Sequence, residues 1–191
     1  MGAACKPATI GVVSDPDDLQ RVLAYVDAAD DTEPIRPIGQ DLYVTSFWTP
    51  QFCAAIVRAA EAVGAFEPQD NDPVPGHEVS LAVISPRLFE RVQADIGERL
   101  WPQLRTAWRH IDYHGLRDVF VIRYALGEQQ SLRIHHDVAQ VSASIKLNDD
   151  YEGGELAFPV HRSGVQVTYG TDPLLTAQVK TGSVSRYAHC A

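Results

Sequence analysis

The residues of this chain best suited to chemistry are His135 and Asp137, in the segment IHHD between stretches typical of β-strands. Side chains two positions apart on an extended chain point to the same face of a sheet, so this imidazole and this carboxylate can hold one metal ion together. A second histidine would complete the facial triad that binds Fe(II) and leaves coordination positions open for O2 and a co-substrate. The pair therefore predicts a metal site.

The chain contains a second pair of this kind, His110 and Asp112. This copy closes a helical pattern, where residues two apart do not share a face. We interpret it as a helix-end histidine and a turn aspartate without a metal role. His136, between the two candidate ligands, is interpreted as a packed or hydrogen-bonded histidine.

The helical elements lie in the first part of the chain. Residues 1–40 are predicted as an N-terminal segment, with an amphipathic helix over 15–28 and an acidic, proline-containing linker over 30–39. Residues 41–191 are predicted as one domain. It would begin with a strand at 42–48, a helix at 49–64, a loop at 66–77 and a helical stretch at 86–110 that Pro102 should kink or divide.

After Gly115 the hydrophobic period changes to that of strands, and a β core is predicted over residues 119–187. The predicted strands span 119–125, 138–147, 155–158, 164–169 and 175–187. Helices followed by short strands indicate an α+β fold, with the N-terminal helices packed against a β-sandwich or jelly roll.

Composition narrows the choice of partners and compartment. The formal charge of −9 argues against a nucleic-acid partner, because neutralising phosphates requires clustered Lys and Arg. A small molecule or peptide suits the chain better. No run is long and apolar enough for a membrane span, and no secretory signal is evident. Three cysteines without CxxC spacing, Cys5, Cys53 and Cys190, suit a reducing compartment, so we expect a cytoplasmic protein.

A longer pattern surrounds the metal pair. FVIRY, then EQQSLRIHHD, then a β-rich run ending LNDDYEGGELAFP, span about 40 residues in order. This pattern resembles the core of the 2-oxoglutarate/Fe(II)-dependent dioxygenases, and within that superfamily it is most similar to the prolyl hydroxylase and procollagen lysyl hydroxylase branch. The resemblance implies a double-stranded β-helix (jelly roll), Fe(II) as the metal and 2-oxoglutarate as co-substrate, with ascorbate as a further candidate cofactor.

By this resemblance His135, Asp137 and a distal histidine are the metal ligands. His189, 52 positions after Asp137, has an acceptable spacing for the distal ligand. Tyr124 matches a tyrosine that binds the co-substrate carboxylate, although a core aromatic is an equal interpretation. The implied reaction is hydroxylation of an unactivated C–H bond of a peptidyl or free amino acid.

The C-terminal part departs from the family pattern. His189 follows Gly182 by only seven positions, and the arginine expected after the distal histidine is missing before Ala191. The last strands are therefore expected to be incomplete. We therefore expect a shortened homologue, a product with a divergent C-terminal sequence, or a variant that uses His189 and a different anchor such as Lys180 or Arg186.

Two other functions stay open. One is a non-catalytic or vestigial domain of the same fold that lacks the complete triad and the 2-oxoglutarate anchor. The other is a cupin-like metalloenzyme that needs no 2-oxoglutarate. The sequence does not define the substrate, the hydroxylated position or the oligomeric state.

Overall fold

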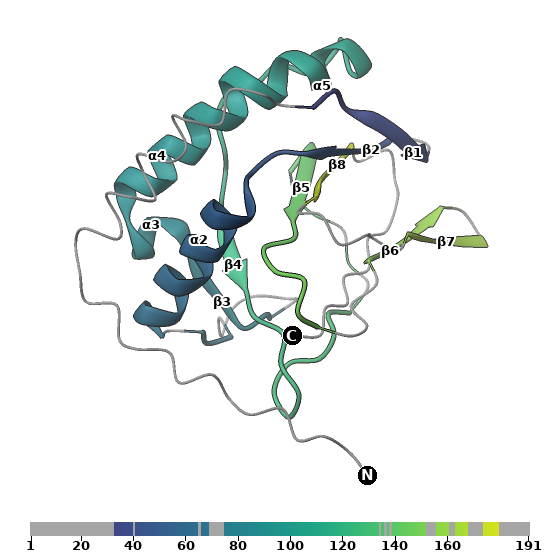
Figure 1. Ribbon diagram of the computed structural model, residues 1–191. Coiled ribbons are helices and arrows are strands. Elements are labelled where there is room, and N and C mark those ends of the chain that lie inside the picture. The colour runs from purple at the N-terminus through teal and green to yellow at the C-terminus, as the bar shows by residue number, and fades with distance from the viewer. Residues whose placement is uncertain are drawn as a thin grey trace.

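The computed structural model describes residues 33–39, 41–64, 66–68, 75–133, 135, 137 and 139–151, and the backbone of the strands within 156–179. Helices and antiparallel strands make up this part of the chain. Figure 1 shows the helices α2 to α5 along one side and the strands β1, β2, β5 and β8 on the other.

The largest sheet has four antiparallel strands in the order β1-β2-β8-β5. Its members are β1 (Arg36–Gly39), β2 (Leu42–Ser46), β5 (Val141–Ile145) and β8 (Leu174–Val179). The central strand β8 places Leu175 opposite both Thr45 of β2 and Ile145 of β5. The late strand β8 thus lies between β5 and the much earlier strand β2, and its pairing with β2 joins parts of the chain that are distant in sequence.

Helix α2 (Pro50–Val63) confirms the predicted helix over 49–64. The side chain of Thr49 accepts a hydrogen bond from the backbone N–H of Phe52, and Pro50 occupies the first turn, where its missing N–H costs nothing. The helix ends at Gly64, whose φ of 67° lies in the left-handed region that glycine adopts without a steric penalty.

The predicted helical stretch at 86–110 is present and ends three residues early. It consists of α4 (Pro86–Asp95), a π-helical turn η1 (Ile96–Leu100) and α5 (Trp101–Ala107), preceded by the short helix α3 (Leu81–Ile84). The π turn directly precedes the segment that contains Pro102. A proline lacks the N–H for the regular ladder and its ring crowds the preceding carbonyls, so the predicted interruption is found there.

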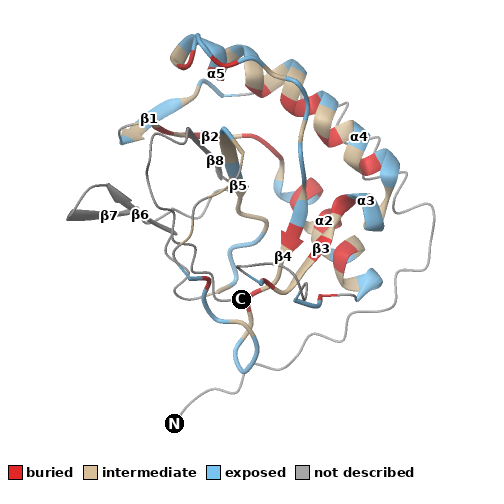
Figure 2. Ribbon diagram, turned by 180° about the vertical axis from the view of Figure 1, so that it is seen from behind, coloured by how far each residue is buried: buried red, intermediate tan, exposed pale blue. Residues whose placement is uncertain are grey.

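The core lies among the helices α2, α4 and α5 and the residues Phe47 and Trp48 that follow β2, and Figure 2 shows buried residues on α2, α4 and β2. Its largest fully buried side chains include Phe52, Ile56 and Leu88. One charged group is buried with them. The carboxylate of Asp95 accepts hydrogen bonds from Nε1 of Trp48 at 2.7 Å and from Arg99 at 2.6 Å, so this charge is paired.

Two further strand pairs complete the described part of the chain. Strand β3 (Glu78–Ser80) pairs with β4 (Phe120–Ile122), and β6 (Leu156–Val160) pairs with β7 (Ser163–Val167). The four predicted strands after residue 138 each correspond to an observed strand with shifted ends. A closed double-stranded β-helix stays a prediction, since the described strands form one four-stranded sheet and two pairs.

Two assignments made from the sequence were wrong. The linker predicted over 30–39 contains strand β1, because Arg36 and Pro37 pair with Val44 and Tyr43 of β2, a contact that local composition does not encode. Strand β3 was not predicted, because three residues are too few for a periodic signal. The predicted helix over 15–28 lies outside the described residues.

Candidate functional site

His135 and Asp137 lie side by side, as their spacing predicts. Nε2 of His135 is 3.1 Å from Oδ1 of Asp137, and the two side chains are 15% and 25% exposed. Two ligands held about 2.1 Å from one metal ion at a right angle would lie about 3 Å apart. The observed separation therefore fits two adjacent positions of an octahedral metal ion.

The orientation of the His135 ring is set by its other nitrogen. Nδ1 lies 2.9 Å from the backbone carbonyl oxygen of Arg133. A carbonyl only accepts, so Nδ1 carries the hydrogen and donates it. Metal-binding histidines commonly donate one ring N–H to a carbonyl in this way, which directs the other nitrogen to the metal. Nε2 facing a carboxylate then suits either a shared proton or a shared cation.

Tyr124 lies two residues after β4 and is buried. Burial raises the pKa of its phenol above the ordinary value, and the nearby negative charge of Glu78 raises it further. The hydroxyl therefore stays protonated over the physiological range and keeps a hydrogen to donate. A protonated buried phenol is the form that could bind a carboxylate, and it is equally the form found in a packed core.

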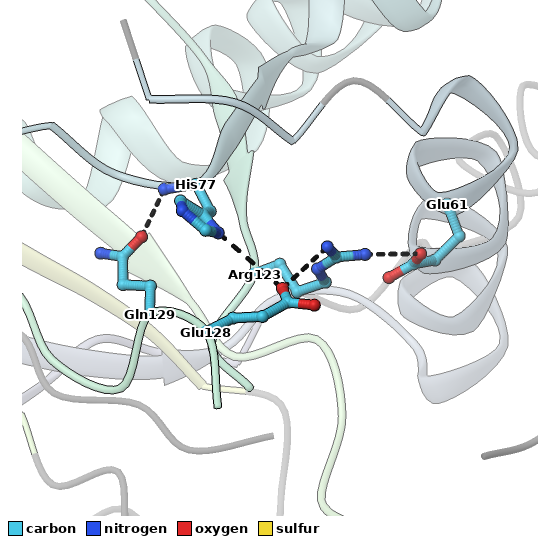
Figure 3. Close-up of polar contacts among 5 residues, drawn as sticks. All are labelled: Glu61, His77, Arg123, Glu128 and Gln129. Carbon is cyan, nitrogen blue, oxygen red and sulfur yellow. Dashed lines mark hydrogen bonds and ion pairs between the residues drawn. The ribbon is translucent and has the colours of Figure 1, made fainter. Parts of the chain in front are cut away.

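A polar cluster that the sequence did not reveal surrounds the end of strand β4 (Figure 3). We call it the Arg123 cluster, and its members are Glu61, His77, Arg123, Glu128 and Gln129. The guanidinium of Arg123 contacts Glu61 of α2 at 3.2 Å and Glu128 at 2.9 Å. It also lies 4.6 Å from the ring centroid of Phe66. One side chain thus joins β4, α2 and the turn after β4.

His77 and Gln129 extend the Arg123 cluster toward strand β3. The backbone N–H of His77 donates to the side-chain oxygen of Gln129, and its carbonyl accepts from the N–H of Arg123 at 2.9 Å. Nδ1 of His77 lies 3.8 Å from Glu128, an electrostatic contact longer than a hydrogen bond. In sequence, the only trace of this cluster is an Arg two positions before the turn ALGE and the Glu that ends it.

A separate cavity of about 420 Å³ lies between α2 and the segment after β5. Its lining includes Arg58 of α2 and the segment 146–150. The Lys146 ammonium there pairs with Asp149 and lies 5.2 Å from the ring centroid of Tyr151. None of the described candidate site residues lines this cavity, so it is distinct from the metal pair.

The remaining predicted residues fall in different places. His189, Lys180, Arg186 and His136 lie outside the described residues. His110 and Asp112 are exposed beyond the end of α5, as expected for a helix-end histidine and a turn aspartate. Within the part of the chain that the structure describes, no three His, Cys, Asp or Glu side chains form a group able to hold a metal ion.

Neither the family models nor the curated proteins give a match to this chain. Among the described helices, none combines the length and apolar character needed to cross a bilayer.

Proposed function

We propose that this chain is an Fe(II)- and 2-oxoglutarate-dependent dioxygenase that hydroxylates an unactivated C–H bond of a peptidyl or free amino acid. The observation that carries the proposal is the geometry of His135 and Asp137. Their facing atoms are 3.1 Å apart, and the second ring nitrogen of His135 is engaged by a backbone carbonyl. This arrangement supports two adjacent ligands of a divalent metal ion.

His135 Nε2 and the Asp137 carboxylate would hold the metal, and His189 is the proposed third ligand. Tyr124 would donate a hydrogen bond to a carboxylate of 2-oxoglutarate, because its pKa is raised and its proton is retained. Bound Fe(II) with 2-oxoglutarate supplies O2 activation. In the overall reaction R–H, O2 and 2-oxoglutarate would give R–OH, succinate and CO2, with one atom of O2 entering R–OH and the other entering succinate.

Fe(II) is the proposed metal because of the ligand types. Two imidazoles and one carboxylate that leave positions open, the set that His189 would complete, are typical of non-haem Fe(II) oxygenases, whereas structural zinc sites are closed by four ligands. The protein's own contribution is to orient these ligands, position the substrate carbon and exclude water.

An anaerobic titration tests the proposal. Fe(II) and then 2-oxoglutarate are added to the full chain, and the metal-to-ligand charge-transfer absorption is recorded. We expect a band in the wild-type protein and its loss in His135→Ala. The matched control is His110→Ala, which removes the histidine of the other His-x-Asp pair from an exposed turn and should leave the band unchanged.

Two outcomes would count against the proposal. No band in the wild-type protein, together with unchanged stability of His135→Ala, would support the non-catalytic domain instead. Oxygen uptake that occurs equally with and without 2-oxoglutarate would support the cupin-like metalloenzyme.

A further inference from the structure

The chain between Tyr124 and His135 folds back through a tight turn. The N–H of Glu128 donates to the carbonyl of Ala125 at 3.1 Å, and the N–H of Ala125 donates to the carbonyl of Gln129 at 2.9 Å. Gly127 has a φ of 82°, as required at the third position of a type II turn. This turn reverses the chain directly after Tyr124, at the start of the stretch that leads along the sequence to His135.

Side chains of the Arg123 cluster fasten both ends of this turn. Arg123 precedes Tyr124, and its guanidinium bonds Glu128 on the returning side at 2.9 Å. Gln129, the next residue, accepts from the backbone N–H of His77 in the segment leading into β3. The returning chain is therefore attached to the β3–β4 pair at two consecutive residues.

The same guanidinium has a second carboxylate partner with a different attachment. Glu61 lies on α2, 3.2 Å from Arg123, and does not belong to the turn. The Glu61 contact fastens Arg123 to the helix, whereas the Glu128 contact closes the turn. Replacing Glu128 therefore tests closure of the turn, whereas replacing Glu61 tests only the attachment of Arg123 to the helix.

We infer that Arg123 and Glu128 are positioning residues, whose ion pair closes the turn 125–128 and so fixes Tyr124 relative to His135 and Asp137. This inference rests on the proposed function, in which Tyr124 binds 2-oxoglutarate beside the metal ligands. Opening of the turn would let Tyr124 and the metal pair move relative to each other. Part of the binding free energy of 2-oxoglutarate would then be used to bring Tyr124 and the metal pair back into position. Co-substrate binding would weaken although no ligand is removed.

The test compares Glu128→Gln with the matched control Glu61→Gln. In the protein without metal, amide hydrogen exchange is measured at Ala125 and Glu128, the two donors that close the turn. Both carboxylates are partly exposed, so loss of the Glu128 contact should raise the equilibrium constant for opening of the turn by about two- to fivefold. We expect faster exchange by this factor in Glu128→Gln and no change at these amides in Glu61→Gln.

The second measurement is the anaerobic titration of both variants with Fe(II) and 2-oxoglutarate. Glu128→Gln should raise the half-saturating 2-oxoglutarate concentration by about two- to fivefold, while Fe(II) affinity stays unchanged. Arg123→Lys keeps the positive charge but cannot contact both carboxylates as the guanidinium does. Its half-saturating 2-oxoglutarate concentration should therefore lie between the values of the wild-type protein and Glu128→Gln.

The outcomes separate the inference from the proposed function. Equal effects of Glu128→Gln and Glu61→Gln on exchange and titration would overturn the inference, while a wild-type charge-transfer band would leave the proposed function standing. A wild-type protein without that band overturns the proposed function and the inference with it.

Discussion

Oδ1 of Asp137 lies 3.1 Å from Nε2 of His135, on the ring edge opposite the Arg133 carbonyl. Asp137→Ala removes the carboxylate that faces this nitrogen. Removing an outer-shell partner of a metal site typically lowers affinity about 10- to 100-fold, so loss of a ligand should cost more than about 100-fold. Calorimetric titration with Co(II) measures this change. Retained Co(II) affinity would exclude Asp137 as a ligand.

Tyr124→Phe should weaken binding of 2-oxoglutarate and leave metal binding intact. The raised pKa keeps the phenol protonated, and a hydrogen bond to a charged group contributes about 1.5–3 kcal/mol. The half-saturating 2-oxoglutarate concentration of the Fe(II)-loaded protein should therefore rise by about tenfold or more. An unchanged value would leave Tyr124 as a core aromatic only.

Trp48→Phe should destabilise the fold, because it removes the indole donor from the buried Asp95 carboxylate. An unsatisfied buried acceptor costs about 1–3 kcal/mol. Denaturant unfolding measures the free-energy change. The control, Trp101→Phe, alters a half-buried tryptophan whose ring packs at a tilt against Tyr113, and it should cost less. Equal losses would indicate that the Asp95 contact contributes little.

Gly97→Ala should also destabilise the fold, through steric overlap. A Cβ at this position would lie 2.8 Å from Cε1 of Tyr113. Overpacking of this kind costs about 1–3 kcal/mol. Tyr113→Ala in the same chain removes the clashing ring, so the double variant should be more stable than the sum of the single changes predicts. Strict additivity of the two unfolding free energies would argue against the clash.

Burial of Cys53 should make the fold sensitive to alkaline pH. Desolvation raises the pKa of its thiol from the ordinary 9.0 to about 12, while the unfolded thiol ionises near 9. Between these values the unfolded chain binds fewer protons, so stability should fall as pH rises, by about 1 kcal/mol per pH unit. Urea unfolding of wild type and Cys53→Ala from pH 8 to pH 10.5 measures the slope. Equal slopes above pH 9 would exclude the thiol as the cause.

Periodicity and capping residues predicted the helices well. Thr49 and Pro50 marked the start of α2, and apolar spacing identified the stretch that begins at Pro86, because these signals are local. Strand β1 escaped prediction because its pairing with β2 depends on residues beyond the local window. The strand order β1-β2-β8-β5 likewise depends on contacts between distant segments.

In the candidate site, too, the sequence predicted contacts between near neighbours and missed contacts between distant elements. The period of an extended chain is enough to bring His135 and Asp137 together, and the structure places them so. The Arg123 cluster joins Glu61, Arg123 and Glu128 from α2, β4 and a turn, which no spacing rule relates. His189 lies outside the described residues, and its role as third ligand stays a prediction.

The π turn at 96–100 holds one residue more than the α-helical turn it replaces. If the same residues continued as a regular α-helix, α5 would instead be rotated by about 100° about its axis, the angle of one residue. The Gln103 side chain, which accepts from Ile35 N–H at 2.8 Å and donates to the Glu33 carbonyl at 3.3 Å, would swing away from them. The extra residue of the π turn thus sets the rotation of α5 about its axis, and with it the contact between Gln103 and the chain that leads into β1.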